Sequence, residues 1–227
     1  MARKALVFDM DGVLVEVSES YRESIVQTVK LFTGETVTRA RIQEYKNQGG
    51  WNNDWALSQK IAHDLGVEVP YETVVEEFNK IFFGTNGTGG LILRERWIAE
   101  PGLLERLAER FGMAIFTGRL RYEADVTLRR FAVETMFHPL VCADDVANGK
   151  PAPDGLDKVR EALDGVELLY IGDTVDDARS SRAAGVPFLG IAAPAVSHRD
   201  ALIGLMRQEG AIAILDDINQ LEQVLDA

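Results

Sequence analysis

The sequence predicts an α/β protein with a parallel sheet covered by helices on both faces, and two patterns carry this prediction. Stretches with the helical spacing of apolar residues, such as 103–111 and 156–163, separate short apolar runs. These runs have the length of strands and recur at 5–8, 113–116, 140–142, 168–171, 188–191 and 211–215. Strands that alternate with helices are typical of parallel sheets, because each crossover helix returns the chain to the same edge.

The region between residues 17 and 96 departs from this alternation. Helical patterns follow one another there, over 20–32, 39–48, 54–65 and 71–83, with no convincing strand among them. We therefore expect a helical domain inserted after the first strand. The predicted architecture is a Rossmann-like, doubly wound parallel sheet core domain over residues 1–16 and 97–227, with an inserted α-helical cap domain over residues 17–96.

Two glycine-containing segments of the inserted region are each open to two interpretations. The stretch 84–90 is either a plain connecting loop or a hinge back to the core domain. The segment 48–55 contains two glycines, two tryptophans and two asparagines. It is either a loop whose Trp51 and Asn52 contact a bound molecule, or the turn before a helix that Asn53 or Asp54 caps, with the tryptophans packed in the domain core. Thr38 likewise stands where a helix cap is expected.

Composition and charge exclude several classes of protein. The 227 residues include 24 Lys and Arg against 36 Asp and Glu, and the net charge of −12 disfavours nonspecific binding of nucleic acid. The first apolar run is too short for a signal peptide, and the stretch 186–196 is too short for a membrane span. The single cysteine, Cys142, cannot form an internal disulfide. We expect a cytoplasmic protein without a nucleic-acid or membrane partner.

Two carboxylates follow the first predicted strand. Asp9 and Asp11 stand one residue apart directly after the run 5–8, and Gly12 lets the backbone turn sharply beside them. In such a pair one carboxylate can act as a nucleophile and the other as a general acid and base. An acidic turn without chemistry would give the same short string, so this motif needs support from the rest of the chain.

Further polar motifs follow other predicted strands. Thr117, Gly118 and Arg119 come directly after the run 113–116; their hydroxyl, backbone N–H groups and guanidinium can hold phosphate oxygens, or the triplet can begin a helix. Lys150 stands between Gly149 and Pro151, and the rigid path that proline imposes suits a positioned point charge better than a solvated surface lysine.

An acidic cluster follows the run 168–171. Asp173, Asp176 and Asp177 repel one another at this strand end unless a cation lies among them, and a hard divalent ion with oxygen ligands would resolve the repulsion. In an open parallel sheet, ligands bind beyond the carboxyl ends of the strands. The four motifs therefore predict one common site.

In their residues and order, these four motifs resemble the haloacid dehalogenase superfamily of phosphohydrolases, in the subgroup whose helical cap is inserted between the first motif and the second. The resemblance covers Lys4 to about Ile191, while the inserted region is similar in position and helical character only. Dehalogenases of this superfamily lack an acid at the position of Asp11, so its presence favours phosphoryl transfer over carbon–halogen hydrolysis.

The resemblance implies a role for each motif. Asp9 would be the nucleophile that forms an aspartyl-phosphate, and Asp11 would protonate the leaving oxygen and then activate water. The Mg²⁺ ligands would be Asp9, the backbone carbonyl of Asp11, and Asp173. The remaining implied roles are support of the metal shell or of Lys150 by Asp177, binding of the phosphoryl oxygens by Thr117 and Lys150, and substrate binding by Gly12, Gly118 and Arg119.

The expected activity is a Mg²⁺-dependent phosphatase for a small phosphorylated metabolite, and three alternatives stay open. They are a phosphomutase, a phosphonate hydrolase that would need an imine-forming lysine such as Lys46, Lys60 or Lys80, and a binding protein that keeps the fold. Sugar phosphates, phosphoglycolate, nucleotides and amino-alcohol phosphates are the candidate substrates. The segments 18–22 and 32–34 resemble a subgroup for which histidinol phosphate has been suggested. The assembly stays open, with a homodimer as one option.

Overall fold

The computed structural model describes residues 4–85 and 88–225. The chain divides into two compact units: Met1–Val15 with Trp97–Ala227, and Glu16–Arg96. The segments that pass between the units pair as a two-stranded sheet, β2 (Val15–Glu16) with β5 (Arg96–Trp97). Each unit is described by itself below.

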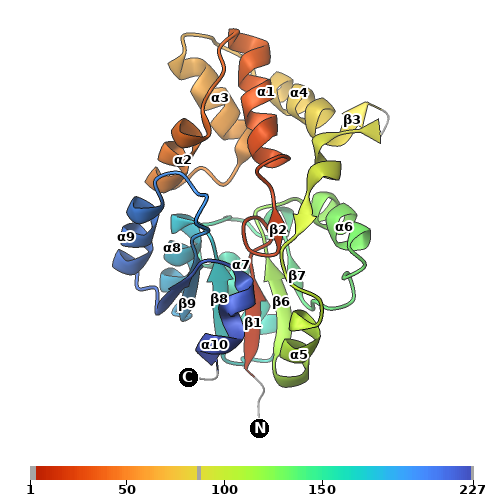
Figure 1. Ribbon diagram of the computed structural model, residues 1–227, viewed down its shortest axis with the longest axis vertical. Helices are drawn as coiled ribbons and strands as arrows, with labels where there is room; N and C mark the ends of the chain where they lie inside the picture. The colour runs from red at the N-terminus through yellow and green to blue at the C-terminus, as the bar shows by residue number, and fades with distance from the viewer. Residues whose placement is uncertain (1–3, 86–87, 226–227) are drawn as a thin grey trace. The chain divides into compact units, whose positions relative to one another are not determined.

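A six-stranded parallel sheet forms the framework of the first unit, as the sequence predicts (Figure 1). Its order is β10-β9-β8-β1-β6-β7, so the chain winds outward from β1 through β6 and β7 and then from β8 outward on the other side. The strands are β1 (Ala5–Phe8), β6 (Gly112–Phe116), β7 (Leu140–Val141), β8 (Leu168–Gly172), β9 (Phe188–Ile191) and β10 (Ala213–Leu215).

Helices cover both faces of this sheet, so β1 is buried along its whole length and its sequence is continuously apolar. Ala5 and Val7 lie in a core cluster with residues of α7, α8 and α9, whereas alternation turns Leu6 and Phe8 to the opposite face. The helices of this unit are α5 (Leu103–Arg110), α6 (Arg121–Arg130), α7 (Asp154–Ala162), α8 (Val175–Ala184), α9 (Arg199–Gln208) and α10 (Leu221–Leu225), with 3₁₀ turns at Ala143–Asp145 and Ile218–Gln220.

Four helices form most of the second unit. Tyr21, Phe78 and Phe82 are buried together in its core, where the rings of Tyr21 and Phe82 stand 4.1 Å apart. Two of the expected caps are present: the Thr38 hydroxyl accepts from the N–H of Arg41, and the Asn53 side chain accepts from the N–H of Ala56. The helices are α1 (Tyr21–Thr33), α2 (Arg39–Gln48), α3 (Asp54–Asp64) and α4 (Tyr71–Phe83), followed by a 3₁₀ turn at Leu91–Arg94. In the described part of the chain, no helix combines the length and apolar character that crossing a membrane requires.

Part of the glycine-rich stretch after α4 forms two short paired strands. β3 (Gly84–Thr85) pairs antiparallel with β4 (Thr88–Gly89), while residues 86 and 87 lie outside the described residues. A Cβ on Gly90 would stand 2.2 Å from the backbone carbon of Phe83, so this glycine permits a close return of the chain onto α4. Apolar periodicity does not predict these strands, because a strand of two residues has no periodicity.

Gly155 allows α7 to pack against β6, which gives a first prediction. A Cβ at this position would lie 2.0 Å from the Phe116 ring. We expect Gly155→Ala to lower the free energy of unfolding by about 1–3 kcal/mol, measured by urea denaturation. Gly204 in α9 is the matched control, because nothing stands within 4 Å of its added Cβ and alanine favours a helix. Equal stability of Gly155→Ala and Gly204→Ala would contradict this packing argument.

Candidate active site

The polar motifs meet at the carboxyl ends of the central strands. Phe8 pairs with Ile115 on one side and with Ile171 on the other, so Asp9 leaves the sheet between the ends of β6 and β8. Lys150 arrives from the loop that precedes α7. The four chain segments therefore converge where the winding of the sheet reverses, the place at which open α/β sheets bind ligands.

Lys150 joins these segments through two short ion pairs. Its Nζ lies 2.8 Å from Oδ1 of Asp9 and 2.7 Å from Oδ1 of Asp177, and its side chain is 2% exposed. The rings of Phe116 and Tyr170 lie within 4.9 and 5.5 Å of the ammonium, which favours a cation at this point. Burial opposes the charge, but the carboxylates of Asp177 and Asp9 outweigh burial and hold the pKa of Lys150 above its usual value.

Asp177 is saturated with hydrogen bonds. Oδ1 accepts from Lys150 and from the Tyr170 hydroxyl at 2.7 Å, and Oδ2 accepts from the backbone N–H and the hydroxyl of Thr174 at 2.9 and 2.6 Å. Burial would raise the pKa of Asp177, yet Lys150 and these hydrogen bonds outweigh burial and hold it below its usual value. A carboxylate whose two oxygens are already satisfied fits a supporting role better than direct ligation. Asp176 instead faces Arg179, at 3.5 Å.

Asp9 is buried beside two further carboxylates. Burial raises the pKa of Asp9 to about 7, with Asp177 and Asp11 adding to the rise and Lys150 opposing it. Its Oδ1 also accepts from the N–H of Met10 at 2.8 Å, which fixes the side chain relative to the backbone turn. Asp9 is therefore held rigidly in a cluster of charged side chains in which the carboxylates outnumber the single ammonium group of Lys150.

The acids of this group match the requirements of a divalent cation. Asp9, Asp173 and Asp177 each offer a carboxylate oxygen, and these atoms all lie within 4.8 Å of one another. Gly12, at φ +74°, brings the turn so close that a Cβ would stand 2.0 Å from Oδ2 of Asp173. Oxygen donors are the ligands that Mg²⁺ prefers, and a cation would relieve the repulsion that raises the pKa of Asp9. The residues present therefore fit the predicted metal.

Thr117 and Gly118 lie at the end of β6. Thr117 is buried, its backbone N–H bonds the carbonyl of Val141, and its hydroxyl oxygen accepts from the N–H of Arg119 at 3.2 Å. This bond uses a lone pair of the hydroxyl oxygen, so the O–H group can still donate to an anion. Gly118 is exposed beside it.

Arg119 turns its guanidinium toward the first motif, and its contact with a substrate stays a prediction. The side chain is 1% exposed, and its Nε donates to Oδ1 of Asp11 at 2.9 Å, while Nη2 bonds the same oxygen. Nη1 donates to the Thr127 hydroxyl at 2.6 Å. The guanidinium is thus turned toward an acid of the first motif, because a buried cation needs a carboxylate and hydrogen-bond acceptors around it.

Three further residues shape the site and are not among those predicted from the sequence. Thr174 forms a helix cap with Asp177, a pattern that the Thr-x-x-Asp spacing could have revealed. Tyr170 is the one residue with a polar side-chain group in the otherwise apolar sequence of β8, and this is a weaker signal. In the structure its hydroxyl donates to Asp177. Thr127 lies inside α6 and carries no local signal, because its partner Arg119 becomes a neighbour only through the fold.

The inserted unit contains the other predicted contacts. Trp51 packs edge-on against the Tyr45 ring, at 6.2 Å, and Asn52 follows it in the loop before α3. Contact of Trp51 and Asn52 with a substrate stays a prediction.

The three lysines considered for imine chemistry are each paired with carboxylates. Lys46 bonds Asp54, Lys60 bonds Asp64, and hydrogen bonds to Glu76 and Glu77 raise the pKa of Lys80 to about 12. An imine-forming lysine must lose its proton, and the two carboxylates beside Lys80 disfavour that loss. Lys80 therefore does not favour the phosphonate hydrolase alternative, and an imine role of Lys46 or Lys60 stays a prediction.

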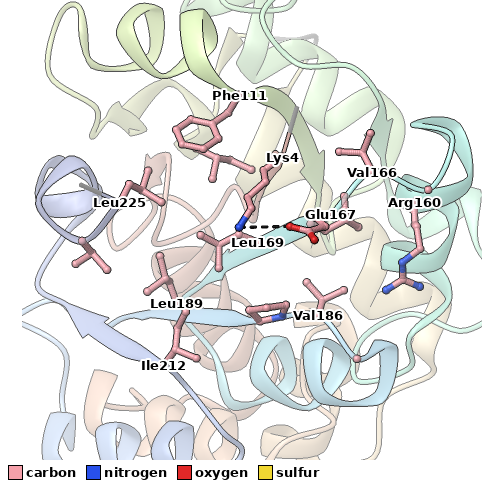
Figure 2. A pocket seen from close by; sticks show the side chains of 16 residues that line it. Lys4, Phe111, Arg160, Val166, Glu167, Leu169, Val186, Leu189, Ile212 and Leu225 are labelled. Carbon is pink, nitrogen blue, oxygen red and sulfur yellow. Dashed lines mark ion pairs between the residues drawn. The ribbon is translucent and has the colours of Figure 1, made fainter. Parts of the chain in front are cut away.

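A cavity of about 680 Å³ lies away from the strand ends just described (Figure 2). Lys4, Glu167 and Leu168 line it at the amino ends of β1 and β8, the opposite edge of a parallel sheet from Asp9. Much of the lining is apolar, as at Val186 and Ile212, and Lys4 pairs with Glu167 at 3.3 Å. This cavity contains none of the four motifs.

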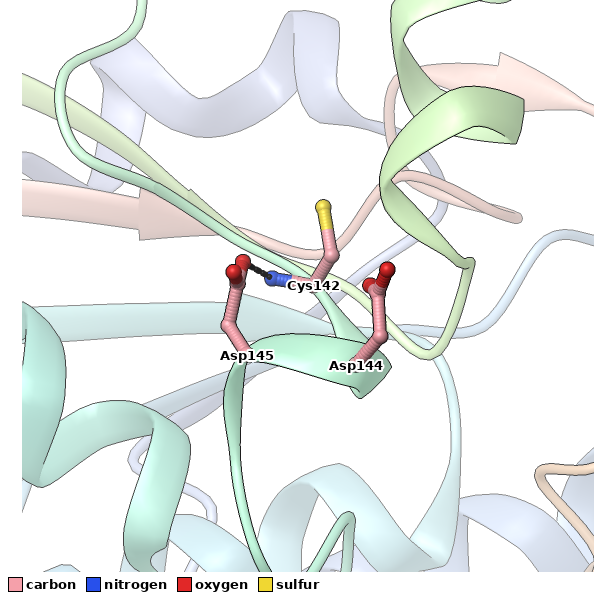
Figure 3. Close-up of side chains that lie close together, drawn as sticks. All are labelled: Cys142, Asp144 and Asp145. Carbon is pink, nitrogen blue, oxygen red and sulfur yellow. Dashed lines mark hydrogen bonds between the residues drawn. The ribbon is translucent and has the colours of Figure 1, made fainter.

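Cys142, Asp144 and Asp145 form a second group of potential metal ligands. Figure 3 shows the Asp145 carboxylate bonded to the backbone N–H of Cys142, at 2.8 Å. Asp145 also pairs with Arg121, and Asp144 accepts from the N–H of Arg121 at 2.9 Å. These bonds fold the chain after β7, and they account for both acids without a metal.

The chain matches the family model for haloacid dehalogenase-like hydrolases over residues 6–191. A relative in Phytophthora nicotianae, named imidazoleglycerol-phosphate dehydratase, is 34% identical over 93% of the chain, and the chain spans half of that relative's length. The phosphorylated carbohydrates phosphatase of Thermotoga maritima is 26% identical over 98% of the chain and its own full length. The crystal structure of a predicted phosphoglycolate phosphatase from Haemophilus somnus superposes with a TM-score of 0.77 at 18% identity, over 98% of each chain, and supports the fold.

The burial of Cys142 predicts a slow thiol. Burial raises the pKa of Cys142 to about 12, with Arg121 opposing and Asp145 adding to the rise. A raised thiol pKa keeps the neutral form until the pH approaches that value, so the thiolate is scarce at pH 8. We expect a colorimetric disulfide reagent to react about 10²–10³ times more slowly with the native protein than with the protein in urea. Similar rates in both states would contradict the burial, and Cys142→Ser should show no reaction.

Proposed function

The chain belongs to the haloacid dehalogenase-like hydrolases, and on this premise we propose that it is a Mg²⁺-dependent phosphatase that hydrolyses a small phosphorylated metabolite. One observation supports this proposal above the others: the buried Lys150 ammonium lies within 2.8 Å of Asp9 and Asp177. An anionic carboxylate can attack an anionic phosphate ester only where fixed positive charge offsets their repulsion. Lys150 supplies that charge directly beside the proposed nucleophile.

The proposed reaction has two steps. In the first, a carboxylate oxygen of Asp9 attacks phosphorus, the bond to the ester oxygen breaks, and Asp11 gives its proton to the departing oxygen. In the second, Asp11 takes a proton from water, the water oxygen attacks the aspartyl-phosphate, and the bond to Asp9 breaks to release inorganic phosphate. Thr117 and Lys150 would hold the phosphoryl oxygens through both steps. The half-buried Gly12 and the exposed Gly118, which have no side chains, would let these oxygens approach the backbone.

Mg²⁺ would be held by Asp9, the backbone carbonyl of Asp11, and Asp173. When bound, it would neutralise charge on the phosphoryl group and orient it for in-line attack. Asp177 would support this arrangement indirectly, because its four hydrogen bonds fix Lys150 and the start of α8. Asp173 would be the ligand that depends most on Gly12, given their close approach.

The substrate class follows from the relatives as a proposal. The Phytophthora nicotianae relative takes its name from imidazoleglycerol phosphate, and the chain matches half of its length. The four motifs serve phosphoryl transfer, so we infer that the matching half hydrolyses a phosphate ester. Histidinol phosphate, an amino-alcohol ester that carries an imidazole, is the first substrate to test, ahead of phosphoglycolate and sugar phosphates.

Release of phosphate tests the activity. We expect Mg²⁺-dependent release from at least one ester of a panel of histidinol phosphate, phosphoglycolate, sugar phosphates and nucleotides, and none in EDTA. Asp9→Asn should retain less than about a thousandth of the wild-type turnover, because the amide cannot form the aspartyl-phosphate. Full activity of Asp9→Asn would refute the mechanism, and transfer within one substrate without release would indicate the phosphomutase instead.

Stabilisation by the metal tests the ligand set. We expect saturating Mg²⁺, at about 100 times its dissociation constant, to raise the free energy of unfolding by about 2–3 kcal/mol, measured by urea denaturation. Asp173→Asn should abolish this increment. Asp176→Asn is the matched control, because Asp176 is buried in the same segment but faces Arg179. Loss of the increment in both variants, or in neither, would contradict the assignment of Asp173.

A further inference from the structure

Arg119 is the largest fully buried side chain whose charge the proposed reaction does not yet use. It follows Gly118 and precedes α6, and its guanidinium lies under Asp11, whose side chain is 32% exposed. A buried guanidinium costs several kcal/mol unless it is paired and hydrogen-bonded. Its position therefore calls for a role beyond solubility or surface charge.

Two N–H groups of Arg119 converge on one oxygen of Asp11. Nε and Nη2 both donate to Oδ1, the former at 2.9 Å. An arginine that clamps a carboxylate more often divides its donors between the two oxygens. Both of these bonds hold Asp11 through Oδ1, and they leave Oδ2 to the proposed proton transfer.

The other side of the guanidinium is anchored to α6. Nη1 donates to the Thr127 hydroxyl at 2.6 Å, and Thr127 is fully buried. The backbone enters α6 through a further bond, from the N–H of Leu120 to the buried Glu123 carboxylate at 2.8 Å. The guanidinium is thus fixed in direction before it meets Asp11.

We propose that Arg119 is a positioning residue for Asp11, which it holds through Oδ1 so that Oδ2 carries the proton to the leaving oxygen. This inference rests on the phosphatase proposed above. In the first step Oδ2–H passes its proton to the ester oxygen as the P–O bond breaks, and the resulting carboxylate keeps its two bonds from Arg119. In the second step Oδ2 takes a proton from the attacking water. Arg119 stays protonated throughout and gains or loses no atom.

This role differs in its kinetics from the substrate contact expected from the sequence. A residue that binds the substrate lowers affinity for every ester when it is replaced. In the first step, a residue that positions the general acid matters only where the leaving oxygen needs a proton. The second step is the same for every ester, so the comparison uses kcat/KM, which reports the first step. An alkoxide leaves poorly without one, whereas 4-nitrophenolate leaves well without protonation.

The decisive experiment compares two esters in steady-state kinetics with Mg²⁺. For Arg119→Met we expect kcat/KM on an alkyl phosphate to fall about 10²–10⁴-fold, and kcat/KM on 4-nitrophenyl phosphate to fall at least tenfold less. Thr127→Val keeps the guanidinium and removes only its anchor, so it should show the same leaving-group selectivity with a smaller loss. Arg129→Gln, exposed on the same helix, is the control and should match wild type.

The outcomes separate this inference from the proposed function. If wild type releases no phosphate from any ester, the phosphatase proposal fails. If wild type is active but Arg119→Met lowers kcat/KM equally on both esters, or on neither, the positioning role is wrong; an equal loss that comes from a rise in KM would assign Arg119 to the substrate. Should Arg119→Met fail to fold by circular dichroism, equal losses on the two esters in Thr127→Val would still overturn the inference.

Discussion

The position of one ammonium group organises the whole site. Lys150 forms ion pairs with both Asp9 and Asp177, and its side chain is almost completely excluded from water. Three separate chain segments must therefore end at the same point: the end of β1, the loop before α7 and the start of α8. A buried charge without partners would cost several kcal/mol, so each segment is held in place by the other two.

The winding of the sheet makes this convergence geometrically simple. β1 lies between β6 and β8, and all three run in one direction, so their carboxyl ends reach the same edge. Small residues then allow the loops to close over one another. Gly12 gives Asp173 the room that a methyl group would take, and Gly172 does the same for Asp177, where a Cβ would stand 2.5 Å from the Cβ of the acid. The positions of Asp173 and Asp177 therefore depend on the absence of a side chain at Gly12 and Gly172.

Much of this architecture is readable from the sequence, because local patterns carry it. β1 and β9, α2 and α4 begin and end where their apolar patterns do, and the order of motifs after strands indicates a common edge. The direction in which a buried side chain points cannot be predicted from these local patterns. Nothing local turns Arg119 toward Asp11, more than a hundred residues earlier, or brings Tyr170 to Asp177, since these contacts depend on tertiary packing. Paired strands of two residues, such as β2 and β5, are equally invisible to periodicity.

The Asp9–Lys150–Asp177 cluster also bears on how this chain could change over evolutionary time. Substituting one member leaves the other charges unpaired in the core. This lowers the free energy of unfolding by about 3–5 kcal/mol, a large part of the stability of an ordinary domain. Replacing all members together with apolar residues can be neutral, but that requires several mutations at once. The path from an enzyme to a non-catalytic binding protein therefore passes through unstable intermediates, and purifying selection on folding alone would preserve these three side chains.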